Sequence, residues 1–272
     1  MSTDTIPTRI IMIGVGGATS SGKTTLAKHL QNCLHDSFII HQDDFVPPAE
    51  NLPVDPEYGF ANWDDAPGAI DWDRMAAFLS DLKKGGILPS NHQSYDSFNE
   101  TRTVPVDDDQ IVQWRLQSEQ VAAIHQEKYG EKLIWALIDG FLLYWDERII
   151  SNLDVRAFIR VPEDIAKSRR EARSYHTPGE QYLFWLSMYM VLIWEIEGDV
   201  WRDPPEYWEK VVWPAYIRAH KHIFEGEDIM GNLNGKVKEL VLLESTEASM
   251  QQMVNVVIEK ILDFSAGTGR VS

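Results

Sequence analysis

Near the amino terminus the chain reads Arg9-Ile10-Ile11-Met12-Ile13-Gly14-Val15-Gly16 and continues as Gly17-Ala18-Thr19-Ser20-Ser21-Gly22-Lys23-Thr24-Thr25. An apolar strand followed by Gly-x-x-x-x-Gly-Lys-Thr and a helix is the pattern of the phosphate-binding P-loop. The glycines let backbone N–H groups turn toward the β-phosphate, Lys23 reaches the β- and γ-oxygens, and Thr24 is placed to ligate Mg²⁺. The sequence therefore predicts a site for a nucleoside triphosphate and Mg²⁺.

A dinucleotide-binding loop is the competing interpretation of the same glycines. Gly14-Val15-Gly16 begins a Gly-x-Gly-x-x-Gly pattern, but Thr19 stands where the last glycine is required. The P-loop pattern has all its positions filled and is therefore favoured.

Composition limits the class of protein and its partners. The 272 residues include 25 basic and 42 acidic side chains, so the net charge is −17. An acidic protein repels polyanions, and we expect a small-molecule partner rather than nucleic acid or an anionic membrane. Cys33 is the only cysteine, which is typical of a reducing compartment. The apolar amino-terminal run is too short for a signal peptide, so we expect a cytoplasmic protein, with entry into the nucleus left open.

Alternating apolar runs predict an α/β fold, with a parallel sheet flanked by helices, in a single domain over 1–272. Strands are expected at 9–16, 37–41, 132–139, 155–161 and 237–243. Helices are expected at 25–35, 71–84, 110–129 and 205–224, with another starting at Pro162. A last helix is expected after a cap at Ser245 or Thr246. Irregular segments are expected at 46–69 and 85–109, and a frayed tail from Ser265.

Two predicted strands end in carboxylates. Gln42-Asp43-Asp44-Phe45 follows the second strand, which places Asp43 at the same sheet edge as the P-loop and suits a general base for phosphoryl transfer. Adjacent acids at this position can also be turn-formers or caps. Asp139 ends the strand at 132–139, where it can contact Mg²⁺ through water or simply cap a helix.

Two further motifs carry side chains suited to a nucleoside and its phosphates. Asn62-Trp63-Asp64-Asp65 combines an aromatic ring for stacking with carboxylates for ribose hydroxyls, although Trp63 could equally anchor a loop. Arg169-Arg170-Glu171-Ala172-Arg173 places Arg169 and Arg173 on one helical face, with Arg170 turned aside. We interpret this cluster as a lid that neutralises transferring phosphate, against the alternative of a solvated basic face.

In their order along the chain, these motifs resemble the nicotinamide riboside kinases, especially the fungal form. The resemblance covers about Arg9 to Asp263 and includes two more motifs, Ile138-Asp139-Gly140-Phe141 and Asp203-Pro204-Pro205-Glu206-Tyr207-Trp208. It implies a P-loop kinase fold related to uridine kinases, with a five-stranded parallel sheet, a lid and a nucleoside-binding region. The implied reaction is ATP- and Mg²⁺-dependent phosphorylation of nicotinamide riboside to its mononucleotide, a step of NAD salvage.

The resemblance implies roles in binding the nucleoside. Asp43 would be the base for the ribose 5′-hydroxyl, and Asp64 with Arg170 would hold the 2′- and 3′-hydroxyls. The pyridinium ring would lie between Trp63 and Tyr175. Its fixed positive charge favours aromatic faces and nearby acids, of which Asp203 is one by resemblance.

The resemblance also implies roles at the phosphates. The γ-phosphoryl group would be stabilised by Lys23, Arg169 and Arg173, and Mg²⁺ would be organised by Thr24, with Asp139 as a further candidate. A uridine/cytidine-type kinase and a non-catalytic P-loop ATP-binding regulatory protein remain the alternative functions.

One segment departs from the pattern of that family. Tyr182-Leu183-Phe184-Trp185-Leu186-Ser187-Met188-Tyr189-Met190-Val191-Leu192-Ile193-Trp194 lies where the relatives have a short connection. A helix apolar on every face must be buried, and this one is shorter than the ~20 residues of a membrane span. It either covers the lid or a neighbouring subunit, or is a retained intron over 179–196, because the codons for Gly179-Glu180-Gln181 can contain a common fungal splice donor.

Overall fold

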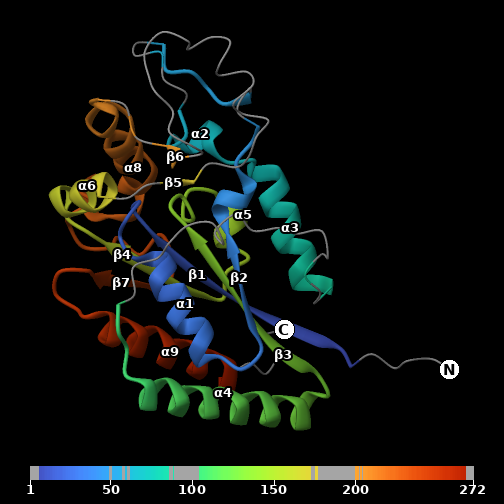
Figure 1. The fold of residues 1–272 in the computed structure, drawn as a ribbon. Helices are drawn as coiled ribbons and strands as arrows, with labels where there is room; N and C mark the ends of the chain where they lie inside the picture. The colour runs from blue at the N-terminus through green and yellow to red at the C-terminus, as the bar shows by residue number, and fades with distance from the viewer. Residues whose placement is uncertain are drawn as a thin grey trace.

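The computed structural model describes residues 6–48, 51–56, 59, 62–85, 88, 104–172, 175–176, 200–201, 203 and 205–267. Its centre is a five-stranded parallel sheet in the order β2-β3-β1-β4-β7 (Figure 1). The strands are β1 (Thr8–Gly17), β2 (Ser37–His41), β3 (Lys132–Gly140), β4 (Val155–Arg160) and β7 (Leu240–Glu244). The predicted α/β class and the five-stranded sheet implied by the resemblance are confirmed.

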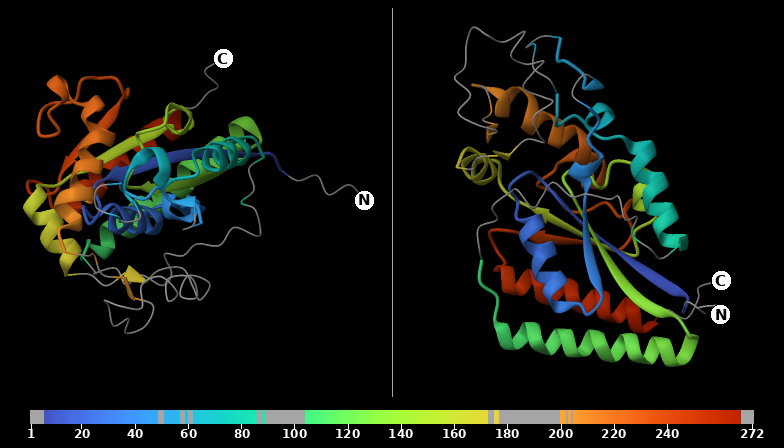
Figure 2. Two further views of the ribbon diagram at one scale, coloured as in Figure 1. Left: turned by 90° about the horizontal axis from the view of Figure 1, so that it is seen from above. Right: turned by 45° about the vertical axis from the view of Figure 1, so that its right-hand side comes forward.

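Helices cover both faces of the sheet because β1 is apolar on both sides. Ile11 and Ile13 pack with α1 (Lys23–Cys33), α4 (Asp108–Tyr129) and α9 (Met250–Gly267). Ile10 and Met12 join the core that includes α3 (Trp72–Gly85) and α8 (Trp213–His220). The right-hand view of Figure 2 shows α4 and α9 side by side on one side of the sheet and α3 on the other. Two apolar layers therefore enclose the sheet.

Helix ends follow local capping chemistry. The Asp107 side chain accepts a hydrogen bond from the Gln110 amide and starts α4, and Gly130, in the left-handed conformation with φ 70°, ends it. α6 (Glu163–Glu171) starts after Pro162 with acids in its first turn and carries Arg169 and Arg170 in its last. The helix polarity thus places two arginines at one end of α6.

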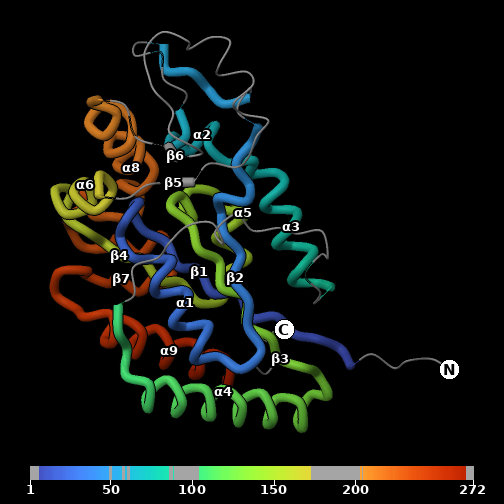
Figure 3. The backbone as a smooth tube through the Cα atoms, viewed as in Figure 1, coloured from blue at the N-terminus to red at the C-terminus, as the bar shows by residue number. Residues whose placement is uncertain are grey.

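The remaining elements are short and lie at the edges of the sheet or in its connections. They are η1 (Gln42–Phe45), α2 (Ala66–Ala69), α5 (Glu147–Ile150), the π-helix η4 (Trp208–Val212), η5 (Lys221–Ile223), η6 (Glu225–Glu227) and the antiparallel pair β5 (Tyr175–His176) and β6 (Val200–Trp201). Figure 3 traces the path from β1 through the loop into α1, then through β2 into η1.

Two predicted boundaries are wrong for backbone reasons. Glu239 has a φ of 56°, which breaks the extended chain, so β7 begins at Leu240 rather than Val237. The long helix predicted at 205–224 is divided into η4, α8 and η5. Pro214 has no amide hydrogen for the carbonyl four residues earlier, and the turn before it widens into the π-helix.

The predictions at the two ends of the last helix are also wrong. Its cap is Ser249, whose side chain accepts from the Gln252 amide at 3.3 Å while the Gln252 side chain accepts from the Ser249 amide at 2.8 Å. Ser265 is buried and hydrogen-bonded to Trp135 and Ile261, so the helix continues to Gly267 instead of fraying from Ser265.

Some predictions lie outside the described residues. These include the segment 179–196, most of 86–103 and the end of the chain from 268. Within the described part of the chain, no helix is both long and apolar enough to cross a bilayer.

Candidate active site

The loop between β1 and α1 has the backbone of an anion cradle. Gly17 has a φ of 147°, and a Cβ there would lie 2.5 Å from the Ile159 carbonyl oxygen, so only glycine fits. Gly22 has a φ of 103° and immediately precedes α1, whose first residue is Lys23. The loop therefore brings backbone amides and a lysine to a helix amino terminus, as a phosphate site requires.

Within this loop the Ser21 hydroxyl is buried and has no hydrogen-bond partner among the described residues. Buried hydroxyls are normally satisfied, so this hydroxyl is suited to a hydrogen bond with a water or a ligand at the loop. Ala18, Ser20 and Thr25 are buried, whereas Thr19 retains partial exposure. The loop is thus closed on the protein side and open toward a ligand at Thr19.

Asp139, at the end of β3, faces the start of α1. One of its oxygens accepts from the Thr24 hydroxyl at 2.5 Å and lies 3.2 Å from Nδ1 of His41. Burial would raise the pKa of Asp139, but the bonds to His41 and Thr24 and the charge of Lys23 outweigh it, and the pKa is lowered. Asp139 is therefore an ionised carboxylate and not a mere helix cap.

The residues around Asp139 fit a hydrated Mg²⁺. Its second oxygen is buried and has no partner among the described residues, and the Thr24 hydroxyl lies beside the carboxylate. Mg²⁺ prefers such oxygen ligands and keeps several waters when it also binds substrate phosphates.

Asp43 lies in η1, directly after β2, and the pairing of His41 with Asp139 places it at the same sheet edge. Surrounding protein raises the pKa of Asp43 by desolvation, and Lys23 opposes that rise. The side chain nevertheless stays open to solvent, which tempers the desolvation and leaves the carboxylate reachable by a substrate. Asp43 thus combines access with proximity to a lysine of the phosphate loop.

Gln42 holds η1 against the end of β3. No role was predicted for it from the sequence. It is fully buried, and its side-chain oxygen accepts from the Leu142 amide at 2.8 Å. A Cβ at Gly140 would lie 2.7 Å from the same oxygen, so Gly140 leaves room for this contact. The Gln-Asp-Asp-Phe motif therefore positions Asp43 through the buried residue beside it.

A second acidic cluster gathers around Arg170 of α6. Arg170 bonds Asp203 at 2.6 and 3.1 Å and Asp64 at 3.4 Å, and both acids are largely shielded from water. Burial raises the pKa of Asp64, and the charge of Arg170 opposes that rise. The structure therefore brings together three predicted site residues, Asp64, Arg170 and Asp203. We call them the Asp64 cluster.

The turn that presents Asp64 is shaped by Asn62. The Asn62 side-chain oxygen accepts from the amides of Asp64 at 3.2 Å and Asp65 at 2.9 Å. Trp63 lies within this turn and is half-buried.

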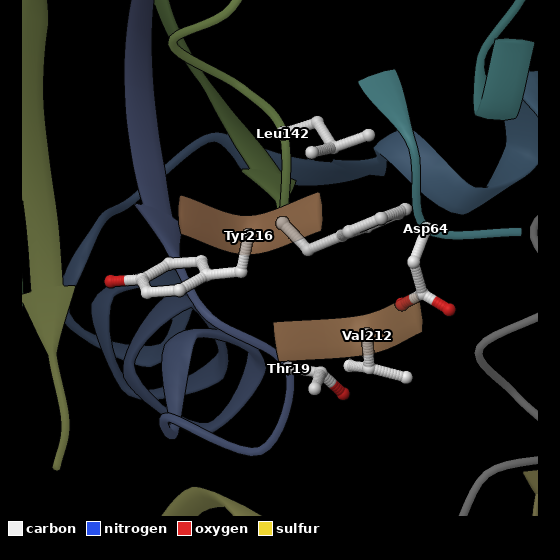
Figure 4. Close-up of a pocket in the computed structure, with 6 residues that line it drawn as sticks. Thr19, Asp64, Leu142, Val212 and Tyr216 are labelled. Atoms are coloured by element: carbon white, nitrogen blue, oxygen red, sulfur yellow. The ribbon is translucent and has the colours of Figure 1, made fainter. Parts of the chain in front are cut away.

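A small pocket joins the phosphate loop to the Asp64 cluster. Its lining residues are Thr19, Asp64, Phe141, Leu142, Val212 and Tyr216 (Figure 4). Asp64 and Thr19 approach it from separate elements, while the other four form an apolar wall. From α6, Arg169 reaches the Ser20 carbonyl oxygen at 3.4 Å, so neighbouring arginines contact the two ends of this region.

A family model described as phosphoribulokinase / uridine kinase family matches residues 12–183. The chain belongs to this family. Among similar proteins, nicotinamide riboside kinase of Schizosaccharomyces pombe is 28% identical over 94% of this chain and 97% of its own length. Nicotinamide riboside kinase of Saccharomyces cerevisiae is 27% identical over 86% of this chain and 88% of its own. Human nicotinamide riboside kinase 2 is 27% identical over 84% of this chain and 85% of its own length.

For this member of the phosphoribulokinase / uridine kinase family, ATP follows as a substrate from the kinase family. Of the sequence-predicted residues, Lys23, Asp43 and Asp139 lie at the carboxyl edge of its sheet, and Asp64, Arg170 and Asp203 form the Asp64 cluster. Arg173 lies outside the described residues, and only the backbone of Tyr175 is described. The sequence did not single out His41, Gln42 or Tyr207, although Gln42 and Tyr207 stand within the quoted motifs and His41 ends the predicted strand at 37–41.

Proposed function

We propose that this protein transfers the γ-phosphoryl group of ATP to the ribose 5′-hydroxyl of nicotinamide riboside and so forms nicotinamide mononucleotide. The observation that carries the proposal is that helix α6 links the phosphate loop to the Asp64 cluster, since Arg169 reaches the Ser20 carbonyl oxygen and Arg170 bonds Asp64. A ribose held through its 2′- and 3′-hydroxyls at Asp64 directs its 5′ end toward the loop. The names of similar proteins, nicotinamide riboside kinase, support the choice of nucleoside.

The proposed chemistry needs few groups, because phosphoryl transfer depends mainly on positioning and charge neutralisation. Asp43 takes the proton of the 5′-hydroxyl as that oxygen bonds the γ-phosphorus, and the bond to ADP breaks. Lys23 and Arg169 offset the negative charge of the transferring group. Thr24 and Asp139 would hold Mg²⁺, which would supply further neutralisation of phosphate charge.

The proposal is tested by supplying ATP and Mg²⁺ with nicotinamide riboside, uridine and cytidine in turn. We expect the highest kcat/KM for nicotinamide riboside. A higher value for uridine or cytidine would make the protein a pyrimidine nucleoside kinase instead. ATP turnover that no nucleoside stimulates would indicate a non-catalytic P-loop protein.

Recognition of the cationic ring is tested at Trp63. A contact between an aromatic face and a desolvated cation contributes on the order of 1–2 kcal/mol, so Trp63→Ala should raise KM for nicotinamide riboside by roughly ten-fold. An uncharged nucleoside should lose less. Equal losses for nicotinamide riboside and uridine would show that Trp63 has only a structural role.

A further inference from the structure

Tyr207 lies behind the Asp64 cluster and is 1% exposed. Its hydroxyl donates to Oδ2 of Asp64 at 3.2 Å. The backbone of Trp63 also hydrogen-bonds this hydroxyl, and the Arg170 guanidinium lies 6.0 Å from the centre of the ring. One buried side chain thus contacts three residues to which nucleoside binding is assigned.

The hydrogen bonds of Tyr207 have a defined direction. Burial, followed by the charge of Asp64, raises the pKa of the phenol, so its proton stays in place. The phenol proton is donated to Asp64, and the phenol oxygen can also accept from the Trp63 backbone. Rotation of the Asp64 carboxylate would break this bond as well as the longer one from Arg170, so Tyr207 and Arg170 together set the orientation of the acid.

The orientation of the Asp64 carboxylate matters because it directs the oxygen lone pairs that have no hydrogen bond from the described side chains. Counted over the described residues, each Asp64 oxygen accepts one side-chain hydrogen bond, Oδ1 from Arg170 at 3.4 Å and Oδ2 from Tyr207. A carboxylate oxygen has two lone pairs, so each keeps one acceptor site. Two acceptor sites at carboxylate spacing match the two hydroxyls of a vicinal cis-diol.

We infer that Tyr207 is a positioning residue that sets the Asp64 carboxylate and the Trp63 backbone in one arrangement, and that discrimination of ribosides from 2′-deoxyribosides depends on it. The inference rests on the proposed function and adds a determinant of sugar specificity to it. A site built to bond a hydroxyl rejects the analogue that lacks it, because its buried acceptor is then left unpaired. A carboxylate free to rotate would lose this penalty.

The test compares kcat/KM for nicotinamide riboside with kcat/KM for its 2′-deoxy analogue in the wild type and in Tyr207→Phe. Each ratio is measured on one preparation, so it does not depend on the fraction that is folded. We expect the ratio to fall by about tenfold in Tyr207→Phe, mainly through a higher KM for the riboside, with kcat and KM for ATP changed less than about twofold.

Tyr144→Phe is the matched control. Tyr144 is fully buried, and its hydroxyl bonds the backbone oxygens of Gly14 and Ala157 within the sheet. Loss of that hydroxyl costs comparable hydrogen bonding, but the riboside-to-deoxyriboside ratio should keep its wild-type value. In an Asp64→Asn background, Tyr207→Phe should add little further change to the ratio, because the residue it orients has lost its charge.

A wild-type ratio in Tyr207→Phe would overturn the inference and leave the proposed function intact. The same holds if Tyr144→Phe lowers the ratio as much as Tyr207→Phe does, since the effect would then reflect general loss of packing. A wild-type protein that phosphorylates no riboside would instead overturn the proposed function itself.

Discussion

Asp43 illustrates how single residues in this site are held between opposing electrostatic effects. Desolvation raises its pKa, Lys23 lowers it, and neighbouring Asp139 raises it again. A proton acceptor with a raised pKa holds the proton it has taken more firmly, which assists removal of a proton from a weakly acidic hydroxyl. Lys23 and Asp139, which belong to the proposed phosphate and Mg²⁺ site, thus also influence the pKa of the proposed base.

The first prediction concerns Asp43→Asn. We expect kcat to fall by roughly 10²–10⁴-fold, because an amide cannot accept the hydroxyl proton, while ATP affinity changes little. Asp44→Asn removes an equal charge one residue away and should cost much less. In the wild type the raised pKa places the acid-side loss of kcat/KM above the usual range of an aspartate. Near-wild-type turnover in Asp43→Asn would remove Asp43 from the mechanism.

His220 makes stability depend on pH. It is fully buried between Phe158 and Tyr216, and burial lowers its pKa from 6.5 to about 4. The native protein therefore keeps this ring neutral, whereas the unfolded chain binds a proton below about pH 6.5. The contribution of the neutral His220 ring to the free energy of unfolding is fully present above about pH 6.5. It is lost as the pH falls toward about 4.

The second prediction compares the wild type with His220→Phe, which keeps an aromatic ring but cannot titrate. Between neutral pH and about pH 4 the wild type should lose up to about 3 kcal/mol more of its free energy of unfolding than the variant. Urea denaturation at several pH values measures the difference. Parallel curves for the two proteins would show that His220 does not carry this pH dependence.

At the scale of elements, α6 is fastened to η4 along its length. Lys167 pairs with Glu209, and Trp208 donates to Glu163 at 3.3 Å. Arg170, further along the same helix, pairs with Asp203. The proposed phosphate-binding Arg169 and the proposed diol-binding Arg170 are therefore carried by one helix braced against the segment that contains Tyr207.

The third prediction concerns the start of α9. Ser249→Ala removes a side-chain cap and should lower the free energy of unfolding by about 1 kcal/mol. Ser245→Ala is the matched control, since the Ser245 hydroxyl is buried and has no hydrogen-bond partner among the described residues. Its removal should leave stability unchanged or slightly higher. The free energy of unfolding of both variants is measured by chemical denaturation. A larger decrease for Ser245→Ala than for Ser249→Ala would contradict the assignment of Ser249 as the cap.

At the scale of the molecule, the apolar cores and the polar site are separated. Fully buried residues such as Trp135 and Phe158 pack on opposite faces of the sheet, whereas Lys23, Asp43 and Asp139 gather at its carboxyl edge. Ligands of open parallel sheets bind at this edge because the strands end there and the helices begin. The site can therefore be altered with little effect on the cores.

The fourth prediction follows from this separation. A ligand that binds only the native state stabilises it by about 2.7 kcal/mol at one hundred times its Kd. ATP with Mg²⁺ should raise the Tm of the wild type, and Lys23→Ala should lose both this shift and turnover while keeping its Tm without ligand. Lys28→Ala, on the same helix but outside the loop, should retain the shift. An undiminished shift in Lys23→Ala would contradict the phosphate-loop assignment.

The sequence was most informative where neighbouring residues carry the whole signal. The Gly-x-x-x-x-Gly-Lys-Thr loop, the apolar runs of β1 and β3, and helix α4 lie where their local patterns predict, because periodicity and backbone freedom are properties of adjacent residues. Boundaries that depend on distant partners were predicted wrongly. Ser265 is ordered by Trp135, which is far from it along the chain, and no local pattern near Ser265 reports that contact.

The site divides in the same way. Residue type and motif were enough to nominate Lys23, Asp43 and Asp64 from the sequence, and to place the first two at one sheet edge. Only tertiary structure brings Asp64, Arg170 and Tyr207 into hydrogen-bonding distance, because they come from three separate segments. The geometry of a carboxylate depends on whatever packs behind it, and this partner is set by the folding of the whole chain rather than by neighbours in sequence.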